Sequence, residues 1–408
     1  MSSVSLLESF GQINATLPDM PQKKVMLLGA GRVGRAIATD MAEAHEIVVA
    51  DASASQLERL KRDNPKIQTK LADFLAIDTL KPEISEADLI ITAVPGNLGY
   101  QVVSQITELG KPVVDISFFA EDPYDLESLA HKSGSIVIVD AGVAPGLSNF
   151  LLGYELTQQT IDTFICYVGG LPIERPWPFQ YKAPFSPSDV IEEYTRPVRQ
   201  RIGGQLVTKP PLSEVELIHI DGIGTLEAFN TDGLRTLLRT TKVPTLIEKT
   251  LRYPGHAEYM QVLAYTGFFS EKPIDINGLS VVPRQLASHL LGQAWDMKPD
   301  ERDCLIMQLQ MQSGRKTIQY TIIDYADEAK QVSAMARTTG YTCTAIASWL
   351  LAHPESLQPG VYAPEQIAAH SDCFSFVRDY LKERGINIQR AEKPVSIDLS
   401  SFSDDQRF

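Results

Sequence analysis

Residues 24–51 read KVMLLGAGRVGRAIATDMAEAHEIVVAD, an order that predicts a strand, a glycine-rich turn, a helix and a second strand. Gly29, Gly31 and Gly34 stand at G-x-G-x-x-G spacing directly after the short apolar run at 24–28. In such a turn the first glycine permits a tight bend, the second lets the backbone approach a pyrophosphate, and the third lets the helix pack closely on the strand. The N–H groups that begin the helix then hold the anion. The stretch therefore predicts a dinucleotide-binding unit.

Asp51 ends the second predicted strand, 22 residues after Gly29, which leaves room for one helix and one strand. A carboxylate at this position accepts hydrogen bonds from the adenosine ribose hydroxyls and repels a 2′-phosphate. Because Ala52, Ser53 and Ala54 offer no cation for that phosphate, we predict NAD rather than NADP. The other residues expected around the cofactor lie in the same turn or follow later strands: Arg32, Val33, Asp73, Val94, Pro95 and Gly96. Asp73 either accepts from the adenine amino group or is only a polar strand end.

Length and pattern divide the chain. At 408 residues it exceeds what one hydrophobic core usually serves, so two domains are expected. Apolar strands alternate with helices through residues 24–146, which predicts an α/β fold with a Rossmann-type, doubly wound parallel sheet. We expect an inserted domain at 147–340, helices at 341–390 that return to the first domain, and a disordered tail at 391–408. Residues 1–23 lack the features of a signal peptide and are expected to be a flexible extension.

Composition limits the possible partners. The net charge is −14 and the Lys and Arg residues are scattered, which argues against nucleic acid or an anionic membrane and favours a small cationic substrate. The four cysteines stand far apart without the spacing of metal ligands, so neither a metal site nor a disulfide is predicted. We interpret them as reduced thiols of a cytoplasmic protein. No apolar run reaches the length of a membrane helix.

The region after residue 146 has a different pattern. Prolines and aromatics interrupt residues 169–187, which predicts a long, shaped loop containing Lys182. Residues 303–313 and 316–325 alternate or run apolar in the manner of strands that expose one face to water. These features predict an α+β domain with a mostly antiparallel sheet. Such sheets commonly meet across a subunit interface, so we expect a homodimer or a higher homo-oligomer.

With these stretches in view, the chain resembles the saccharopine dehydrogenase (reductase) family and looks most like its L-lysine 6-dehydrogenases. The resemblance covers about residues 24 to 390 and implies a Rossmann domain with an inserted domain that binds an amino-acid substrate. Besides the glycine turn it rests on four stretches: DAGVAPGLSN at 140–149, YKAPFSPSDVIEEYTRPVR at 181–199, GTLEAFNTDGLRTL at 224–237 and KTLRYPGH at 249–256.

The chain departs from the saccharopine reductases at one informative place. Two arginines that hold the extra dicarboxylate of saccharopine in that family fall, in our alignment, near Ser188 and at Thr231. An uncharged hydroxyl cannot make the bidentate contact that a carboxylate accepts from arginine. The resemblance therefore implies oxidative deamination of the terminal amine of L-lysine or a similar amino acid.

This chemistry needs a proton acceptor within hydrogen-bond reach of the reacting amine. His256 and Asp115 are the candidates, since imidazole titrates near neutral pH and Asp115 ends a strand at the expected cofactor edge. Arg252 is the expected partner of the substrate carboxylate, although His256 could be structural and Arg252 could form an ion pair between domains. The other residues expected to contact substrate are Asp232, Thr231, Asn230, Lys182 and Glu193.

Two alternatives stay open at this stage. The enzyme could act on saccharopine or another substituted amino acid, or the chain could bind NAD without turnover, as a sensor on the same fold. Sequence alone does not decide between them.

The first prediction concerns the cofactor. We expect kcat/KM to be clearly higher with NAD than with NADP, because Asp51 repels the 2′-phosphate. Asp51→Ala should relax that preference and leave the KM for the amino acid nearly unchanged. Steady-state kinetics with both cofactors checks this, and equal values for the wild-type protein would contradict the assignment.

Overall fold

The first domain is built on a seven-stranded sheet in which every neighbouring pair is parallel. A computed structural model describes residues 21–183, 187–298 and 301–394, apart from the side chains at 187–189. The strand order is β17-β6-β5-β4-β1-β2-β3. Successive strands are therefore added on one side of β1 up to β3 and on its other side from β4 onward. The strands are β1 (Lys24–Leu28), β2 (Glu46–Asp51), β3 (Gln68–Leu71), β4 (Leu89–Thr92), β5 (Val113–Asp115), β6 (Ile136–Ile138) and β17 (Gly360–Tyr362).

Helices connect these strands and cover the sheet. They are α1 (Arg32–Met41), α2 (Ala54–Asp63), α3 (Lys81–Glu86), α4 (Gly96–Glu108) and α5 (Glu127–Ser133), with 3-10 turns at Ile77–Leu80 and Pro123–Leu126. The glycine turn behaves as expected. A Cβ on Gly29 would lie 2.3 Å from the Ala93 oxygen, and one on Gly34 would lie 2.1 Å from the Gly29 oxygen. The predicted Rossmann-type fold is confirmed.

The second domain contains a nine-stranded, mostly antiparallel sheet. Its order is β10-β11-β12-β7-β15-β16-β18, with β8 and β9 attached beside β12, and β7–β12 is its parallel pair. Burial alternates along the second half of β15, where Leu309 and Met311 are buried while Gln310 and Gln312 are partly exposed. The strands are β7 (Thr163–Pro172), β8 (Val198–Ile202), β9 (Gln205–Lys209), β10 (Glu216–Ile220), β11 (Gly224–Asn230), β12 (Thr245–Arg252), β15 (Asp303–Ser313), β16 (Lys316–Tyr325) and β18 (Gln389–Pro394).

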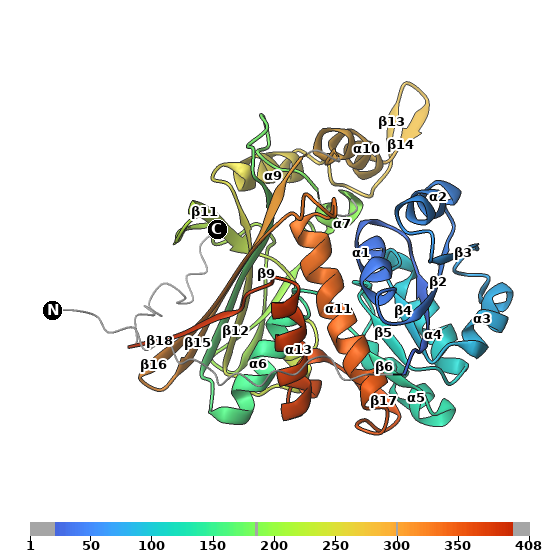
Figure 1. The fold of residues 1–408 in the computed structure, drawn as a ribbon. Helices are drawn as coiled ribbons and strands as arrows, with labels where there is room; N and C mark the ends of the chain where they lie inside the picture. The colour runs from blue at the N-terminus through green and yellow to red at the C-terminus, as the bar shows by residue number, and fades with distance from the viewer. Residues whose placement is uncertain (1–20, 184–186, 299–300, 395–408) are drawn as a thin grey trace.

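Helices and a hairpin complete this domain. Figure 1 shows α7, α9, α10 and the β13–β14 hairpin grouped at one end of the large sheet, with α6 lying along it. These elements are α6 (Leu147–Gln158), α7 (Pro187–Glu193), α8 (Leu237–Thr240), α9 (His256–Tyr265), β13 (Ile274–Ile276), β14 (Leu279–Val281) and α10 (Pro283–Trp295).

The helix α11 (Ala334–Ala352) lies between the two sheets (Figure 1). One core cluster joins side chains of all three elements, among them Leu27 of β1, Leu309 of β15 and Trp349 of α11. A Cβ on Gly340 would lie 3.2 Å from the Ala36 Cβ, so a small residue lets α11 approach α1 closely. The helix therefore joins the two domains through one continuous core.

The C-terminal segment returns to the first domain, as expected, but it also adds strands. After α11 come α12 (Pro364–Ile367) and α13 (Ser371–Glu383), and Arg384 pairs with Asp40 of α1 at 2.6 Å. In contrast to the prediction, β17 extends the parallel sheet, and residues 391–394 belong to β18 at the edge of the second sheet. The strand β17 is too short to show a period, and β18 is a charged edge strand without an apolar face. The rest of the N-terminal extension and of the tail lies outside the described residues.

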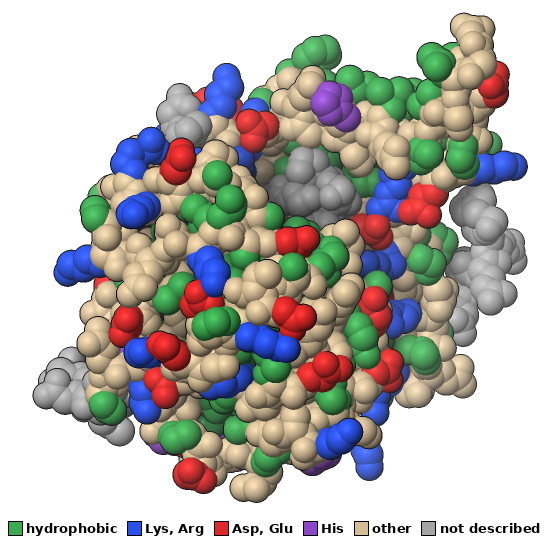
Figure 2. Space-filling view, turned by 90° about the vertical axis from the view of Figure 1, so that its right-hand side faces the viewer, with side chains coloured by type: hydrophobic (Ala, Val, Ile, Leu, Met, Phe, Trp, Pro, Cys, Tyr) green, Lys and Arg blue, Asp and Glu red, His purple; other side chains and the backbone are tan. Residues whose placement is uncertain are grey.

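Charged side chains of both signs are mixed on the surface. Lys and Arg side chains are interspersed with Asp and Glu over the face seen in Figure 2. None of the helices in the described part of the chain is long and apolar enough to cross a membrane.

Candidate active site

The candidate site lies where the carboxyl ends of β5 and β6 face the second domain. Asp115 ends β5, and Asp140 follows β6. Arg235, from the loop after β11, pairs with Asp140 at 3.0 Å between Nε and Oδ2. This ion pair joins the two domains at the edge of a parallel sheet, where open α/β folds bind their ligands.

The cofactor turn is preorganised around Asp51. One carboxylate oxygen accepts from the Ala30 N–H at 2.6 Å and the other from the Ser53 N–H at 2.7 Å. A Cβ on Gly31 would meet nothing within 4 Å, so the space beside the turn is open for a pyrophosphate. These groups fit a dinucleotide.

Arg32, which was expected to contact the cofactor, instead bonds to the second domain. Its Nη1 donates to the Ala183 oxygen at 3.0 Å, and its Nη2 donates to Asp296 and to the Met297 oxygen at the same distance. The guanidinium therefore ties the glycine turn to the second domain, while Val33 continues α1 beside it. Backbone N–H groups remain available for the phosphates.

The other expected cofactor residues lie at the same edge of the sheet. Asp73 follows β3 and accepts from the Leu75 N–H at 3.0 Å, which is the contact of a polar strand end. Val94 and Pro95 lead from β4 into α4, and a Cβ on Gly96 would lie 2.5 Å from the Phe118 oxygen. Gly96 thus allows the loop after β5 to approach α4 closely.

Asp115 is fully buried. One of its oxygens accepts from the Thr92 hydroxyl at 2.5 Å, and the other has no hydrogen-bond partner among the described residues. Burial raises the pKa of Asp115 to about 7, an effect that the Thr92 hydrogen bond opposes. A carboxyl group in this state can accept or release a proton near neutral pH.

The sequence interpretation missed Glu248, on β12. Glu248, Thr250 and Arg252 stand two residues apart, so they share one face of the strand. Burial first, and then the charges of Asp232, Glu193 and Asp140, raise the pKa of Glu248 to about 8. The sequence does carry a signal for it, because Glu248 in TLIEKTLR lies an even number of residues before Arg252, on the same face of the predicted strand.

Gly233 provides the space for this carboxyl group. A Cβ on Gly233 would lie 1.5 Å from Glu248 Oε1, so the two positions depend on each other. The glycine at position 233 in the loop after β11 is therefore explained by packing.

Arg252 is buried and already has partners. Its Nη2 pairs with Glu193 at 3.0 Å, and its Nε donates to the Tyr194 hydroxyl at 3.4 Å. The guanidinium also lies 4.4 Å from the centre of the Tyr181 ring. Arg252 and Glu193, both expected at the substrate, are thus paired with each other. The pair lies within the inserted domain, so it is not the ion pair between domains that was the alternative for Arg252.

His256 is locked in a neutral form. Its Nδ1 lies 3.0 Å from the Phe179 carbonyl oxygen, so Nδ1 donates, and Nε2 accepts from the Tyr194 hydroxyl at 2.9 Å. Burial, followed by the charge of Arg252, lowers the pKa of His256 to about 3. Since both ring nitrogens have a partner and the residue is 2% exposed, the geometry does not support His256 as the proton acceptor.

The remaining expected substrate contacts are also used inside the protein. Asp232 pairs with Arg199 at 2.8 Å, and the Thr231 hydroxyl lies 2.9 Å from that of Thr250. Asn230 accepts from the Gln200 amide at 3.0 Å and donates to Ser213 at the same distance. Lys182 donates to the Asp296 oxygen at 2.9 Å and pairs with Glu301 at 3.2 Å. Buried polar groups need such partners, and a linear sequence does not reveal them. The side chain of Ser188 lies outside the described residues.

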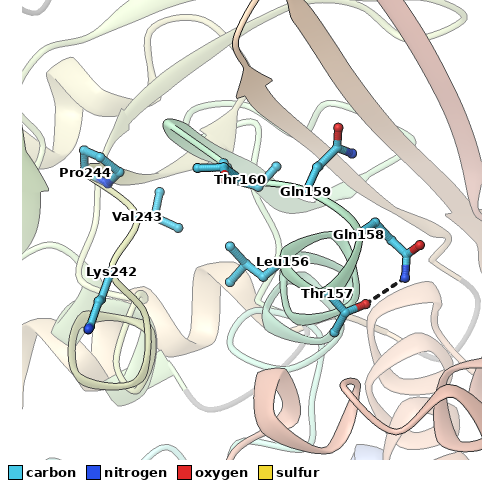
Figure 3. Close-up of a pocket in the computed structure, with 9 residues that line it drawn as sticks. Leu156, Thr157, Gln158, Gln159, Thr160, Lys242, Val243 and Pro244 are labelled. Atoms are coloured by element: carbon cyan, nitrogen blue, oxygen red, sulfur yellow. Dashed lines mark hydrogen bonds between the residues drawn. The ribbon is translucent and has the colours of Figure 1, made fainter.

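A surface hollow of about 510 Å³ lies elsewhere (Figure 3). It is formed by the C-terminal end of α6 and the loop before β12, and none of the residues discussed above lines it. Its lining residues are Leu156, Thr157, Gln158, Gln159, Thr160, Ile161, Lys242, Val243 and Pro244. In the described ranges no three His, Cys, Asp or Glu side chains come together as metal ligands, and all four cysteines are buried and free.

A parallel sheet with a dinucleotide-binding turn, whose carboxyl edge meets buried carboxyl groups of a second domain, defines a two-domain protein of the Rossmann class. The chain belongs to the saccharopine dehydrogenase family. The saccharopine dehydrogenase NADP binding domain matches residues 25–138, and the saccharopine dehydrogenase C-terminal domain matches residues 142–386.

Curated relatives carry the name saccharopine dehydrogenase [NADP(+), L-glutamate-forming]. The protein of Schizosaccharomyces pombe is 27% identical over 60% of this chain and 58% of its own length, and that of Saccharomyces cerevisiae is 22% identical over 68% and 66%. The matched stretch therefore spans about three fifths of the Schizosaccharomyces pombe protein. A solved structure of apo saccharopine dehydrogenase (L-Glu forming) from Saccharomyces cerevisiae has a TM-score of 0.73 at 20% identity, covering 92% of this chain and all of that one, and it shows the same fold.

The raised pKa of Glu248 predicts a pH dependence of stability. The folded-state pKa of about 8 exceeds the ordinary value of 4.5, so the folded protein holds the proton more tightly than the unfolded chain. The contribution of protonated Glu248 to the free energy of unfolding is fully present below pH 4.5. It decreases as the pH rises toward about 8, by at most about 1.4 kcal/mol per pH unit. Glu248→Gln should therefore become more stable relative to wild type at about pH 8 than at about pH 5.

Urea unfolding at both pH values measures this difference. Glu258→Gln, an exposed position on α9, is the matched control and should follow the wild-type protein. Parallel stability curves for Glu248→Gln and wild type would contradict the assigned pKa.

Proposed function

We propose that the protein oxidises the terminal amine of L-lysine, or of a similar amino acid, with NAD as the oxidant. The observation that carries the proposal is the group of buried carboxyl side chains around Glu248, close to the carboxyl edge of the nucleotide-binding sheet. Such a group suits a cationic diamino substrate and supplies a proton acceptor.

The cofactor identity rests on Asp51. Bound NAD would accept a hydride from the carbon that bears the amine. The open space at Gly31 and the N-terminus of α1 fit its pyrophosphate, and the carboxylate of Asp51 fits the ribose hydroxyls. The relatives and the matching domain carry NADP in their names, so the choice of NAD remains our proposal.

Proton transfer is assigned to Asp115 and Glu248 in place of His256. The reacting ammonium loses one proton before the hydride leaves, and the resulting imine is attacked by water, which releases ammonia and a semialdehyde that cyclises on its own α-amine. Asp115, with a pKa of about 7, suits an acceptor that works near neutral pH, and Glu248, with a pKa of about 8, becomes an acceptor as the pH approaches 8. Thr92 orients Asp115 for this role.

The substrate class follows from Thr231. Its hydroxyl is buried and bonded to Thr250, so this position supplies no cation for a second carboxylate. The names of the relatives favour saccharopine or another substituted amino acid as the alternative substrate, and NAD binding without turnover is the other alternative.

We also propose that the protein is a homodimer or a higher homo-oligomer. Apolar side chains are exposed on α9, the β13–β14 hairpin and α10, and exposed patches of this kind mark association surfaces. They include Val262, Tyr265, Ile274, Ile276, Leu279, Leu286 and Leu290. Analytical ultracentrifugation should show a dimer or larger species that Leu279→Glu with Leu290→Glu weakens. A monomeric wild-type protein at micromolar concentration contradicts this proposal.

The substrate prediction is tested by a panel of amines. We expect NAD reduction with L-lysine at a kcat/KM well above that for saccharopine, because no cation stands at Thr231 to receive the second carboxylate. Asp115→Asn and Glu248→Gln should each be assayed across the pH range, and loss of the acceptor should cost about 10²–10⁴ in kcat. Leu217→Ala, on the exposed side of β10, is the control and should retain the wild-type rate.

The opposite outcomes are equally informative. Efficient turnover of saccharopine would replace the lysine assignment. NADH binding without oxidation of any amino acid in the panel would favour the non-catalytic alternative.

A further inference from the structure

The ion pair between Asp140 and Arg235 has unused hydrogen-bonding capacity. The two side chains are 1% and 5% exposed, so the pair is buried at the junction of the domains. Within the described ranges, Asp140 Oδ1 and Arg235 Nη2 are buried atoms without a hydrogen-bond partner. A charged group left partly unsatisfied in a protein interior is costly, which makes two such atoms on one ion pair unusual.

The backbone at both residues is strained as well. The φ angle is +55° at Asp140 and +42° at Arg235, in the left-handed region that residues other than glycine rarely adopt. Strain of this kind persists where the surrounding structure enforces it, and it gathers at ligand sites. The conformation of the chain and the unsatisfied atoms therefore point to the same place independently.

Aromatic and cationic groups surround the pair. The guanidinium of Arg235 lies 4.8 Å from the centre of the Phe118 ring and donates through Nη1 to the Phe119 oxygen. Arg196 lies 5.0 Å from the same Phe118 ring, and its nearest carboxylate, Glu192, is 3.7 Å away. Both cations thus contact one ring, on the loop that follows Asp115.

We propose that Asp140 and Arg235 recognise the α-amino acid head of the substrate. The spare oxygen of Asp140 matches an α-ammonium group, and the spare nitrogen of Arg235, helped by Arg196, matches the α-carboxylate. The inference rests on the proposed function for the identity of the substrate. It moves the carboxylate contact from Arg252, whose three nitrogens each have a partner, to Arg235.

The chemistry of the pair selects this ligand class. An inorganic anion would meet the negative charge of Asp140, and a simple diamine would leave Arg235 Nη2 unpaired. A zwitterion satisfies both atoms at once. Because the pair is closed to solvent, binding requires the Phe118 ring or the two domains to move apart.

Calorimetric titration of the full chain, with and without NADH, tests the proposal. L-Norleucine carries the amino acid head without a terminal amine, and cadaverine carries two amines without a carboxylate. In Asp140→Asn with Arg235→Gln, which keeps an amide pair in place of the ion pair, norleucine affinity should fall about tenfold to a hundredfold. Cadaverine affinity should fall by less than norleucine affinity does, since cadaverine can lose only an ammonium contact with Asp140 and makes no carboxylate contact with Arg235.

Two further variants separate binding from folding. Arg196→Gln should weaken norleucine binding about threefold to tenfold. If the double variant does not fold, this variant tests whether the site binds the carboxylate of norleucine. Arg239→Gln is the matched control, because Arg239 also makes an ion pair between the domains, with Asp122 at 2.7 Å, but on an exposed site. The control should bind norleucine as wild type does.

The proposal is overturned if the variants bind norleucine as tightly as wild type, if the control weakens equally, or if the wild-type protein binds no amino acid. One further outcome would contradict the proposed function alone. If norleucine binds and the variants lose it, while no diamino acid is oxidised, the recognition site stands and the lysine dehydrogenase activity fails.

Discussion

The close packing of α11 between the two sheets is the constraint on which the rest of the structure depends. Its side chains belong to one core with both sheets, and a Cβ on Gly340 would lie 3.2 Å from that of Ala36 on α1. Cores of this density resist deformation, so the distance between the sheets is set by packing. The carboxyl edge of the parallel sheet is thereby held opposite β12 and the loop after β11. Arg32 adds a second tie, because it joins the glycine turn to Ala183 and Asp296.

Polar groups at this junction fall into two kinds. Asp232 with Arg199, and Arg252 with Glu193, form pairs that hold the inserted domain together. Asp115, Asp140 and Arg235 each keep a buried atom without a partner in the described part of the chain. In the first kind, a partner inside the protein satisfies each buried charge. In the second kind, a ligand that supplies the missing hydrogen bond would gain the most binding free energy. This contrast distinguishes Asp115, Asp140 and Arg235 from the paired charged residues near them.

The sequence interpretations differed in how far they depended on contacts between distant segments. The G-x-G-x-x-G turn and Asp51 act through local geometry, so their place in the structure followed from spacing alone. Asp115 was identified from its position at a strand end, and burial there raises its pKa to about 7. His256, in contrast, looked like a base only because its partners, the Phe179 carbonyl and the Tyr194 hydroxyl, were invisible in the sequence. Glu248 was missed because a charged residue in a strand does not reveal which face is buried.

The sequence by itself determined the α/β class, the nucleotide turn, the alternating strands at 303–313 and 316–325, and the family, since each of these depends on local patterns along the chain. Only the tertiary structure decided that β17 and β18 join different sheets, that Arg252 is occupied by Glu193, and that Asp140 meets Arg235. These outcomes depend on contacts between segments that are distant in the chain. Burial and charge pairing arise from such contacts, and they set the pKa values and the unsatisfied atoms from which the chemistry is inferred.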